Sequence, residues 1–392
     1  MLPRTCTSTL EKLQRGFPVV TLTGPRQSGK TPLARLLAAG RPYVSLEDPD
    51  QRQLALEDPR TFLGRFPDGG VLDEVQRCPE LFSYLQTRVD RDGRMGLFLL
   101  TGSQQFGLLE GITQSLAGRS AFVELLPFSV AELCNADRLE ADLDVHLLKG
   151  GYPPLYDREV APADWFAAYV TAYIERDVRQ QLKVQDLETF RRFVRLCAGR
   201  CGQLLNLSSL AADCGVTHNT AKAWVSVLEA SYLVFLLRPH YENFNKRLVK
   251  ARKLYFHDAG LAAWLLGIRT AEQLALHPLR GSLFECLVVA ELVKARLNRG
   301  EPHGLHFWRD SNGQEVDLLI EQGSRLQPVE IKAGRTVNPE FFRGLEKWTA
   351  LAGQHAVAPV LVYGGDENFS YKDMRVVGWR DVGPSIPDLV TK

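Results

Sequence analysis

The first residues whose types and spacing could do chemistry form a short loop of small and polar side chains. The loop matches the pattern G-x-x-x-x-G-K-[ST] in full, with an apolar run before it and a helical stretch after it. It reads Gly24, Pro25, Arg26, Gln27, Ser28, Gly29, Lys30 and Thr31. Glycines let backbone N–H groups curl around phosphates, and the start of the following helix adds the positive end of its dipole. Lys30 would reach the β- and γ-phosphates and the Thr31 hydroxyl would ligate Mg²⁺, so the loop predicts a nucleoside triphosphate site.

An acidic pair follows a later apolar run. Residues 70–72 are directly followed by Asp73 and Glu74. Hydrolysis of a nucleoside triphosphate needs a second acidic site on a strand beside the phosphate-binding loop. Asp73 would hold the Mg²⁺ shell, directly or through water, and Glu74 would polarise the attacking water. Since the loop lies upstream, we favour this interpretation over two solvated acids at a strand end.

Two further positions are candidates for contact with the transferred phosphate. The apolar run 97–101 leads into a polar turn in which Ser103 or Gln104 would act as the sensor. Residues of these types are also common in ordinary turns, which is the alternative interpretation. Arg119 is a candidate arginine finger, acting in its own chain or on a neighbouring copy, and a surface salt bridge is the alternative.

These residues need elements that position them. Apolar runs at 19–23, 43–46, 70–73, 97–101 and 121–125 alternate with helical or polar stretches, which predicts a parallel sheet buried on both faces. From 164 to about 237 the pattern is helical, and strand-like runs return at 306–308, 316–320, 328–331 and 360–363. The fold class is therefore α/β, then helical, then α/β again. We expect domains at 1–150, 151–280 and 281–392.

The middle part has the order of a winged helix-turn-helix. Residues 207–225 read as a helix, a tight turn and a second helix, with Ser208 and Thr217 as caps, and a strand at 233–237 follows. Such a module would place polar side chains in a DNA major groove and basic ones on phosphates, and packing against protein is the equal alternative. The polar set is Asn219, Thr220 and Lys222, and the basic stretch holds Arg238, Lys246, Arg247, Lys250, Arg252 and Lys253, interleaved with Tyr241 and Phe244.

The C-terminal part carries spaced acidic residues. Glu285 lies in an expected helix, Asp317 in a strand, and Glu330 two residues before Lys332 in the next strand. This order resembles the catalytic constellation of the restriction-endonuclease-like superfamily. Residues two apart in a strand share a face, so Glu330 and Lys332 would point the same way. Such carboxylates would bind Mg²⁺ while Lys332 orients a water, and a cross-face ion pair is the alternative.

The motifs together resemble a widespread family of bacterial and archaeal ATPases of the AAA+ superfamily. The segments that carry the resemblance are 24–31, 72–76, 100–103, 116–119, 126–129, 150–153, 173–177, 255–260 and 281–285. The resemblance covers nearly the whole chain. It implies an AAA-type ATPase domain that uses ATP and Mg²⁺, a helical and winged-helix middle region and a nuclease-like α/β terminal domain. DNA, another protein and a second copy of the chain are the partners it leaves open.

Composition sets the broad class. The chain has 392 residues, 47 basic against 46 acidic ones, net charge +1 and 45% hydrophobic residues. This balance is typical of a globular protein with two or three domains and excludes a disordered chain, a collagen-like repeat or a small disulfide scaffold. No apolar run has the roughly 18–20 residues of a membrane span, and the N-terminus lacks the pattern of a secretory signal. Because no such run is present, we expect no membrane partner. The seven cysteines are an odd, scattered set, which is typical of a reducing compartment, so we expect a cytoplasmic location.

Two groups of metal-ligand type are interpreted as structural. Cys197, Cys201, Cys214 and His218 have a spacing that loosely resembles a zinc finger. Cys197 and Cys201 lie one helical turn apart, which favours small buried hydrophobes over zinc ligands. His257 and Asp258 are adjacent, and adjacent residues of a strand face opposite ways.

Overall fold

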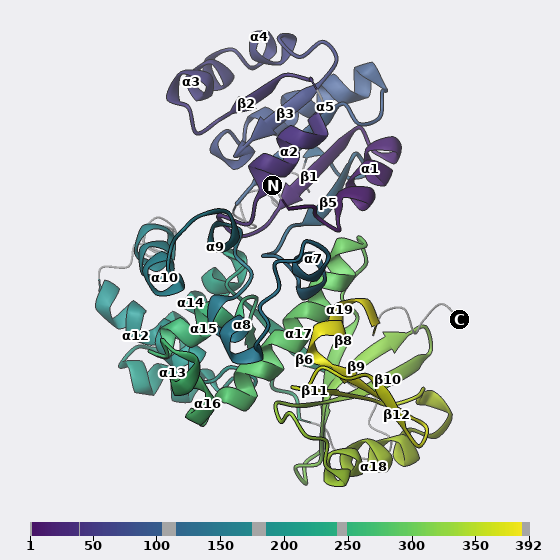
Figure 1. The fold of residues 1–392 in the computed structure, drawn as a ribbon. Helices are drawn as coiled ribbons and strands as arrows, with labels where there is room; N and C mark the ends of the chain where they lie inside the picture. Colours follow the sequence, from purple (N-terminus) through teal and green to yellow (C-terminus); the bar gives the residue numbers. More distant parts are fainter. Residues whose placement is uncertain (1, 39, 104–114, 175–185, 241–248, 386–392) are drawn as a thin grey trace. The chain divides into compact units, whose positions relative to one another are not determined.

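The computed structural model describes residues 2–38, 40–103, 115–174, 186–240 and 249–385 (Figure 1). They divide into two compact units. The first holds Met1–Phe128 together with Ala230–Tyr232 and Leu297–Glu301, and the second holds Ser129–Glu229, Leu233–Arg296 and Pro302–Lys392. The sequence analysis expected domain boundaries near residues 150 and 280. In the structure, the residues before and after each of these two positions belong to the second unit.

The first unit contains a five-stranded sheet in the order β2-β3-β4-β1-β5, and all its neighbours pair in parallel. The predicted parallel sheet is confirmed. Strands β1, β3 and β4 are buried along their whole length, as continuous apolar runs require. The strands are β1 (Val19–Thr23), β2 (Tyr43–Ser45), β3 (Gly70–Asp73), β4 (Phe98–Gly102) and β5 (Ser120–Glu124).

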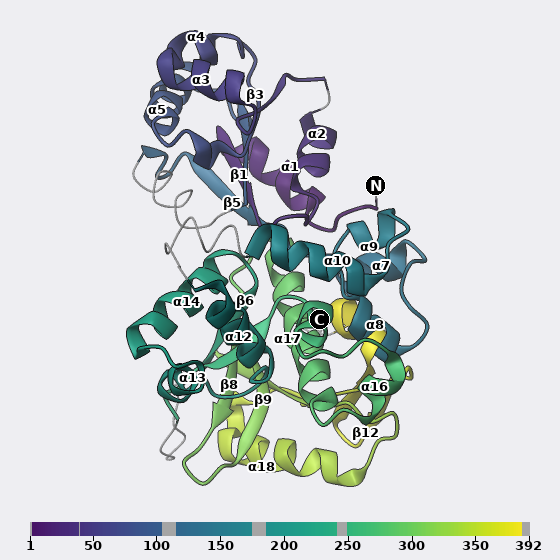
Figure 2. The same cartoon turned by 90° about the vertical axis from the view of Figure 1, so that its left-hand side faces the viewer.

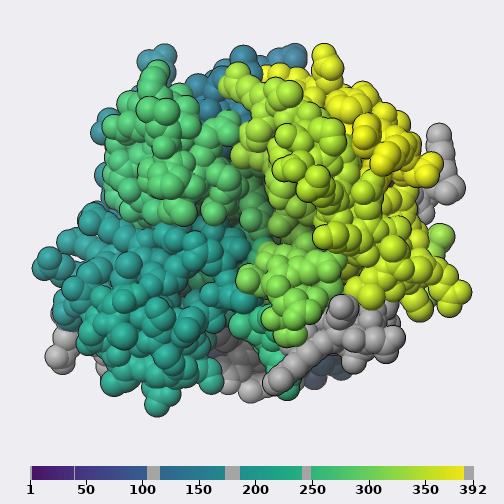
Figure 3. Space-filling model, turned by 90° about the horizontal axis from the view of Figure 1, so that it is seen from below, coloured from purple at the N-terminus to yellow at the C-terminus, as the bar shows by residue number. Residues whose placement is uncertain are grey.

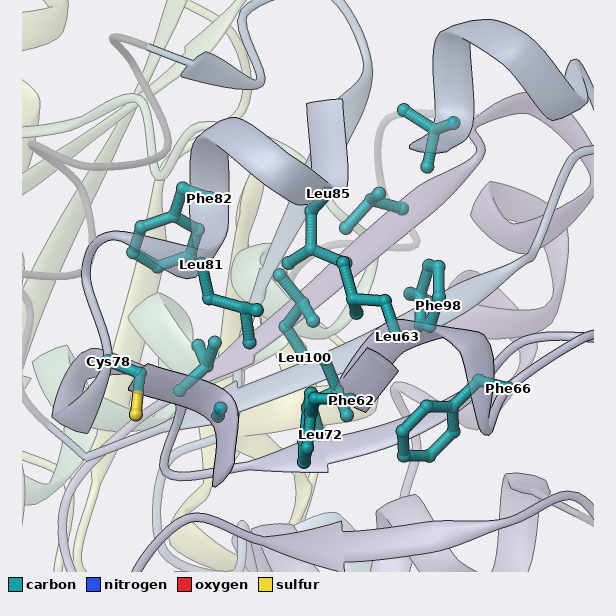
Figure 4. Packing of buried hydrophobic residues seen from close by; sticks show 14 of the residues in the cluster. Phe62, Leu63, Phe66, Leu72, Cys78, Leu81, Phe82, Leu85, Phe98 and Leu100 are labelled. Carbon is teal, nitrogen blue, oxygen red and sulfur yellow. The ribbon is translucent and has the colours of Figure 1, made fainter. Parts of the chain in front are cut away.

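Helices cover both faces of this sheet (Figure 2). Helices α1 (Thr7–Gly16) and α2 (Lys30–Ala38) pack through Leu10 and Leu33 on one face. The other face is covered by α3 (Pro49–Glu57), α4 (Pro59–Gly64) and α5 (Leu81–Asp92). Figure 4 shows the core on that side, where aromatic and leucine side chains of the helices meet Leu72 and Leu100 of the strands. Because successive strand residues point to opposite faces, neighbouring residues of one strand supply both cores.

The second unit begins with helices. They are α7 (Val130–Asn135), α8 (Leu143–Lys149), α9 (Pro154–Asp157), α10 (Pro162–Tyr169) with a π-helical continuation (Val170–Ile174), α12 (Leu187–Ala198), α13 (Leu207–Cys214), α14 (His218–Ala230), α15 (Ala259–Leu265), α16 (Ala271–Leu276) and α17 (Arg280–Asn298). Between α13 and α14, Gly215 has a φ of 70° and ends the first helix. Asn206 caps α13 and the Thr217 hydroxyl accepts from the Thr220 N–H, so Ser208, expected as the first cap, lies inside α13 instead.

An eight-stranded mixed sheet completes the second unit, in the order β12-β13-β11-β10-β9-β8-β6-β7. Its strands are β6 (Val234–Pro239), β7 (Lys253–Phe256), β8 (Leu305–Arg309), β9 (Glu315–Gln322), β10 (Arg325–Lys332), β11 (Val360–Tyr363), β12 (Phe369–Tyr371) and β13 (Met374–Gly378). Helix α18 (Arg343–Ala352) packs Trp348 against Trp308 of the sheet. Figure 3 shows one face of this unit, where the helical part (teal) lies beside the sheet part (yellow-green to yellow).

Two features of this sheet differ from the sequence expectation. The strand expected at 233–237 does form, as β6, but it pairs with β8 as well as β7, so the β6–β7 hairpin belongs to the C-terminal sheet. Strands β12 and β13 had no predicted counterpart. Among the described helices, none has the length and apolar character needed to cross a membrane.

Candidate nucleotide-binding site

The loop after β1 has a backbone that its sequence dictates. Gly24 has a φ of 145°, and a Cβ at this position would lie 2.1 Å from the carbonyl oxygen of Leu125, so only glycine fits. Gln27 and Gly29 also have positive φ, at 64° and 92°. Helix α2 begins directly afterwards, at Lys30. The loop is therefore held at the carboxyl end of β1, with its backbone turned into a helix N-terminus.

Lys30 folds back over this loop. Its Nζ donates hydrogen bonds to the carbonyl oxygens of Gly24 at 2.9 Å and Pro25 at 2.7 Å, and the residue is only 6% exposed. Burial lowers the pKa of Lys30 to about 8, although the carboxylates of Glu74 and Asp73 oppose this shift. A buried ammonium whose hydrogen bonds go to carbonyl oxygens is only partly compensated, and an anionic phosphate beside it would favour its charged form.

Thr31 and Asp73 meet across two elements. The Thr31 hydroxyl donates to Asp73 Oδ2 at 3.0 Å, and the Tyr43 hydroxyl donates to the same oxygen at 2.5 Å. Thr101, at the end of β4, donates to the other carboxylate oxygen. Burial and the bond to Asp73 raise the pKa of Tyr43 to about 12, so Tyr43 stays a donor. Three hydroxyl groups therefore hold the Asp73 carboxylate in place. The residue is only 4% exposed.

Glu74 follows with a left-handed backbone, at a φ of 56°. Its backbone N–H donates to the Thr101 hydroxyl at 3.3 Å. The Ser103 hydroxyl donates to Glu74 Oε2 at 3.0 Å, and the Gln76 amide donates to the same oxygen. The structure therefore brings Ser103 and Glu74 together. Gln104, the alternative sensor, lies outside the described residues.

The phosphate-binding loop is also held by an arginine that the sequence analysis did not identify. Arg4 donates from its guanidinium to the carbonyl oxygens of Ser28 at 2.8 Å and Leu126 at 2.6 Å, and it lies over the Phe128 ring at 4.7 Å. Arg4 is 6% exposed. Arg26, by contrast, lies 4.0 Å from the carboxylate of Glu47. Buried arginine between carbonyl groups stabilises the loop by charge-assisted hydrogen bonds.

Arg119 is not part of this site. It immediately precedes β5, whose first residue Ser120 is opposite Val19, the first residue of β1. The phosphate-binding loop follows the last residue of β1, so Arg119 lies at the opposite edge of the sheet. Its guanidinium binds Asp90, with Nε 2.5 Å from one carboxylate oxygen. The structure therefore does not bring Arg119 to the phosphate-binding loop of its own chain, and the arginine-finger role stays a prediction.

Polar residues of the second unit form a separate cluster. Glu285 of α17 accepts from Lys253 Nζ at 3.0 Å and from the Tyr255 hydroxyl at 2.5 Å, and Lys253 Nζ also lies 2.5 Å from Glu315. Burial and the Asp317 charge raise the pKa of Glu285 to about 7, while Lys253 opposes the shift. Lys253 is 3% exposed, so it is not the solvent-facing wing residue that the basic stretch predicted.

The remaining candidates of the C-terminal part adjoin this cluster. Lys332 Nζ lies 2.5 Å from Glu330 and 3.8 Å from Asp317, whose Oδ2 accepts from the Ile331 N–H at 2.8 Å. Burial and the Asp317 charge raise the pKa of Glu330 to about 7. The structure thus brings together Glu285, Asp317, Glu330 and Lys332. Within the described ranges, however, no three His, Cys, Asp or Glu side chains are grouped so that they could hold a metal ion.

Other sequence candidates are distributed between surface and core. Asn219 and Lys222 are exposed at the start of α14, and Thr220 is half-buried. Lys246, Arg247, Tyr241 and Phe244 lie outside the described residues. The three cysteines of the zinc-like spacing, Cys197, Cys201 and Cys214, are buried, whereas His218 is exposed. Asp258 accepts from the N–H groups of Gly151 and Leu261 and caps α15.

Three known domain families match successive parts of the chain. Residues 16–134 match an "AAA domain", and residues 140–272 and 280–382 match two domains of unknown function, DUF8612 and DUF4143. The Walker-type ATPase PABY2304 of Pyrococcus abyssi covers 66% of this chain and 94% of its own, at 15% identity and a TM-score of 0.41.

Two mycobacterial proteins are similar over nearly the full length. They are Mb2031c of Mycobacterium bovis and Rv2008c of Mycobacterium tuberculosis, both described as uncharacterized. Each is 33% identical over 377 residues, which is 94% of this chain and 82% of the relative. The chain belongs to the family of these two proteins, and its N-terminal part, residues 16–134, matches an AAA domain.

Proposed function

We propose that the chain binds ATP with Mg²⁺ in the loop 24–31 and hydrolyses it, and that its nucleotide state regulates an attached module that binds or processes DNA. The observation that carries the first part is the hydrogen bond of 3.0 Å between Thr31 and Asp73. It joins the hydroxyl at the end of the phosphate-binding loop to the carboxylate at the end of β3. Hydroxyl and carboxylate oxygens are the ligands that Mg²⁺ prefers, so these residues fit the ion.

Each residue of the site has a role in this proposal. Mg²⁺, when bound, supplies positive charge to the phosphates, and Thr31 and Asp73 would hold it, directly or through water. Lys30 would exchange its two carbonyl partners for phosphate oxygens, since an anion is the better partner for an ammonium. The backbone N–H groups of the loop residues 26–29 would face the phosphates. Glu74 would accept a proton from the attacking water or orient it.

Ser103 would report the state of the site to Glu74. Its hydroxyl donates to the carboxylate that the proposal assigns to the water, and it stands at the end of β4, beside β1. A γ-phosphate near this hydroxyl would compete with Glu74 for its proton. Loss of that hydrogen bond would leave Glu74 a better proton acceptor.

The second part of the proposal concerns the helical and C-terminal regions. Helices α13 and α14 with the β6–β7 hairpin have the order of a winged helix-turn-helix, with Asn219 and Lys222 exposed for contact with DNA. The order α17, β8, β9, β10 carries an acid on a helix, an acid on a strand and an acid-x-Lys pair, which supports a nuclease-like domain.

A second candidate is a nucleotide-gated regulator that binds DNA or protein and does not cut. The observation that favours it is the pairing of the cluster carboxylates with Lys253 and Lys332. Carboxylates paired with ammonium groups are poor ligands for a divalent ion. This candidate keeps the same ATP site and the same exposed face of α14.

The ATP site is tested by nucleotide binding and hydrolysis. Wild-type protein is expected to bind ATP with Mg²⁺ and release phosphate, and Lys30→Ala is expected to bind roughly 10- to 100-fold more weakly, since bonds to charged groups contribute about 1.5–3 kcal/mol. Lys12→Ala changes an exposed lysine of α1 and serves as the matched control. Equal binding by wild type and Lys30→Ala would contradict the assignment.

The two candidates for the attached module are separated by a plasmid-nicking assay. Wild type and Asp317→Ala are compared with and without ATP. Nicking that Asp317→Ala abolishes supports a nuclease, and the absence of nicking together with salt-sensitive DNA binding supports the regulator. Lys222→Glu is expected to weaken that DNA binding, because it reverses a charge on the exposed face of α14.

A further inference from the structure

The turn that follows α14 carries a tyrosine in a backbone conformation that favours glycine. Tyr232 has a φ of 56°, and the N–H of Leu233 donates to the carbonyl oxygen of Leu228 at 3.0 Å. This is the Schellman arrangement that ends many helices, and glycine usually occupies its left-handed position because it has no Cβ. A left-handed backbone costs a residue with a Cβ on the order of 1–2 kcal/mol, so contacts of the tyrosine side chain must hold it there.

Those contacts lie at the end of β1. The Tyr232 hydroxyl donates to the Thr23 hydroxyl at 2.8 Å, and both residues are buried. Thr23 in turn donates to the carbonyl oxygen of Val123 at 3.5 Å, and its own carbonyl oxygen accepts from the Leu125 N–H at 2.7 Å. Burial and the charge of Glu124 raise the pKa of Tyr232, so the hydroxyl keeps its proton. Tyr232 is therefore tied to the β1–β5 strand pair at the residue directly before the phosphate-binding loop.

The course of the chain gives this hydrogen bond its importance. Residues 230–232 belong to the first unit, whereas the preceding part of α14 and the whole of β6 belong to the second. The bond between Tyr232 and Thr23 thus lies within the first unit, while its donor is covalently continuous with α14. That helix carries the exposed Lys222, which the proposed function assigns to DNA contact. A displacement of Tyr232 would act on the hydrogen bond that closes the end of α14.

Thr23 adjoins the part of the loop whose partners would change when nucleotide binds. Lys30 Nζ donates to the carbonyl oxygens of Gly24 and Pro25, the two residues that follow Thr23. In the proposed function, Lys30 exchanges these carbonyl groups for phosphate oxygens, and N–H groups of the loop bind phosphate as well. The loop then has two discrete arrangements, which are the two states that coupling between distant sites requires.

We infer that Tyr232 is a positioning residue that couples the phosphate-binding loop to α14. Its hydroxyl follows the position of Thr23, and its left-handed backbone passes a change at that position to the end of the helix. The inference rests on the ATP site of the proposed function, and it names the contact through which nucleotide would regulate the attached module. Because coupling is reciprocal, a ligand bound to α14 would change the affinity for ATP by the same factor.

Hydrogen–deuterium exchange of the full-length protein tests this coupling, with and without a non-hydrolysable ATP analogue and Mg²⁺. In wild type, the analogue is expected to slow exchange in residues 226–234 by about fivefold or more, because the ordered loop fixes Thr23 and with it the end of α14. Tyr232→Phe keeps the ring and removes the hydroxyl, so it is expected to bind the analogue and to lose most of this response. Each variant is compared with itself, so a loss of stability alone does not remove the response.

Thr9→Val is the matched control. The Thr9 hydroxyl donates to the carbonyl oxygen of Asn298 at 2.8 Å, in residues 297–301, another segment of the first unit that continues from a helix of the second. This variant is expected to respond as wild type does. Thr23→Val removes the acceptor of the Tyr232 bond and is expected to lose the response, whereas Thr23→Ser keeps a hydroxyl and is expected to retain it. The two Thr23 variants give the answer if Tyr232→Phe does not fold.

The inference is overturned if Tyr232→Phe and Thr23→Val respond as strongly as wild type, because the hydroxyl pair is then not the link. It is also overturned if wild type binds the analogue and exchange at the end of α14 does not change. Calorimetry on the same preparations measures binding of the analogue. Absence of binding by wild type would contradict the proposed ATP site itself, and the inference with it, so the two failures are distinguished.

Discussion

The hydroxyl of Thr31 and the carboxylate of Asp73 are 3.0 Å apart, although 42 residues separate them in the chain. The parallel sheet makes this distance short. Thr31 stands in the first turn of α2, which follows β1, and Asp73 ends β3, with only β4 between the two strands. Because all three strands run the same way, their carboxyl ends meet at one edge of the sheet. The candidate Mg²⁺ ligands are therefore placed by strand order.

Asp73→Asn is expected to weaken ATP binding in the presence of Mg²⁺ by about 10- to 100-fold, the usual effect of losing a metal-site carboxylate or its support. Binding measured with a chelator in place of Mg²⁺ is expected not to weaken, because without the ion the Asp73 carboxylate only repels the phosphates. Fluorescence titration under both conditions checks this. Asp50→Asn, an exposed change in the first turn of α3, is the control, and equal losses with and without Mg²⁺ would argue against a metal role.

Glu74→Gln is expected to keep ATP binding and to lower the rate of hydrolysis about 10²- to 10⁴-fold, as for loss of a general base. The amide still accepts the hydrogen bond from Ser103, so the local structure should persist. Phosphate release and nucleotide affinity are measured together. Glu47→Gln removes a nearby carboxylate that is 50% exposed, and it should hydrolyse ATP as wild type does. A Glu74→Gln protein with normal turnover would remove Glu74 from the mechanism.

Gly24→Ala is expected to disrupt the phosphate-binding loop. The new Cβ would lie 2.1 Å from the Leu125 carbonyl oxygen, on a backbone with a φ of 145°. Strain of this kind costs on the order of 1–3 kcal/mol, so both the melting temperature and ATP affinity should fall. Gly16→Ala is the matched control, since a Cβ there has no atom within 4 Å. Normal ATP affinity in Gly24→Ala would mean that the loop conformation differs from the one described.

A site residue could be predicted from the sequence where a local sequence pattern identifies it, and not where its role depends on the order of the strands in the sheet. The loop residues, Asp73 and Glu74 were found because each follows an apolar run in a recognisable order. Tyr43 and Thr101 were missed, since their role depends on which strands become neighbours, and no local pattern encodes that. The distance of Arg119 from the loop could not be predicted for a related reason: the motif that contains it does not reveal at which edge of the sheet β5 begins.

The fold shows the same division. Continuous apolar runs predicted the parallel strands of the first unit, because burial on both faces leaves a clear signal in each strand. The join between β6 and β8 was not predicted, since it links residues about 70 positions apart by two pairs only, Arg238 with His306 and Pro239 with Phe307. Lys253 was assigned to a basic surface because the sequence does not show that β7, paired with β6, belongs to this sheet. Its buried position becomes visible only when Glu285 and Glu315 are placed beside it.

The affinity for ATP is expected to fall as the pH rises above about 8, because burial lowers the pKa of Lys30 to about 8 in the nucleotide-free protein. Below that pH the ammonium is already charged and binding takes up no proton. Above it, phosphate must bind a neutral lysine or recruit a proton, so Kd should rise by up to about tenfold per pH unit until the pKa of the complex is reached.

The same pKa sets the sign of a stability effect. The unfolded chain holds the Lys30 proton up to about 10.5, so between about 8 and 10.5 it binds more protons than the folded state. This group alone therefore makes the nucleotide-free protein more stable as the pH rises through that window, while ATP affinity falls. Calorimetric titrations at several pH values, in buffers of different ionisation enthalpy, measure the proton uptake directly. Lys30→Arg, whose guanidinium stays charged, should lose the pH dependence, and a wild-type Kd that is constant to pH 10 would contradict the lowered pKa.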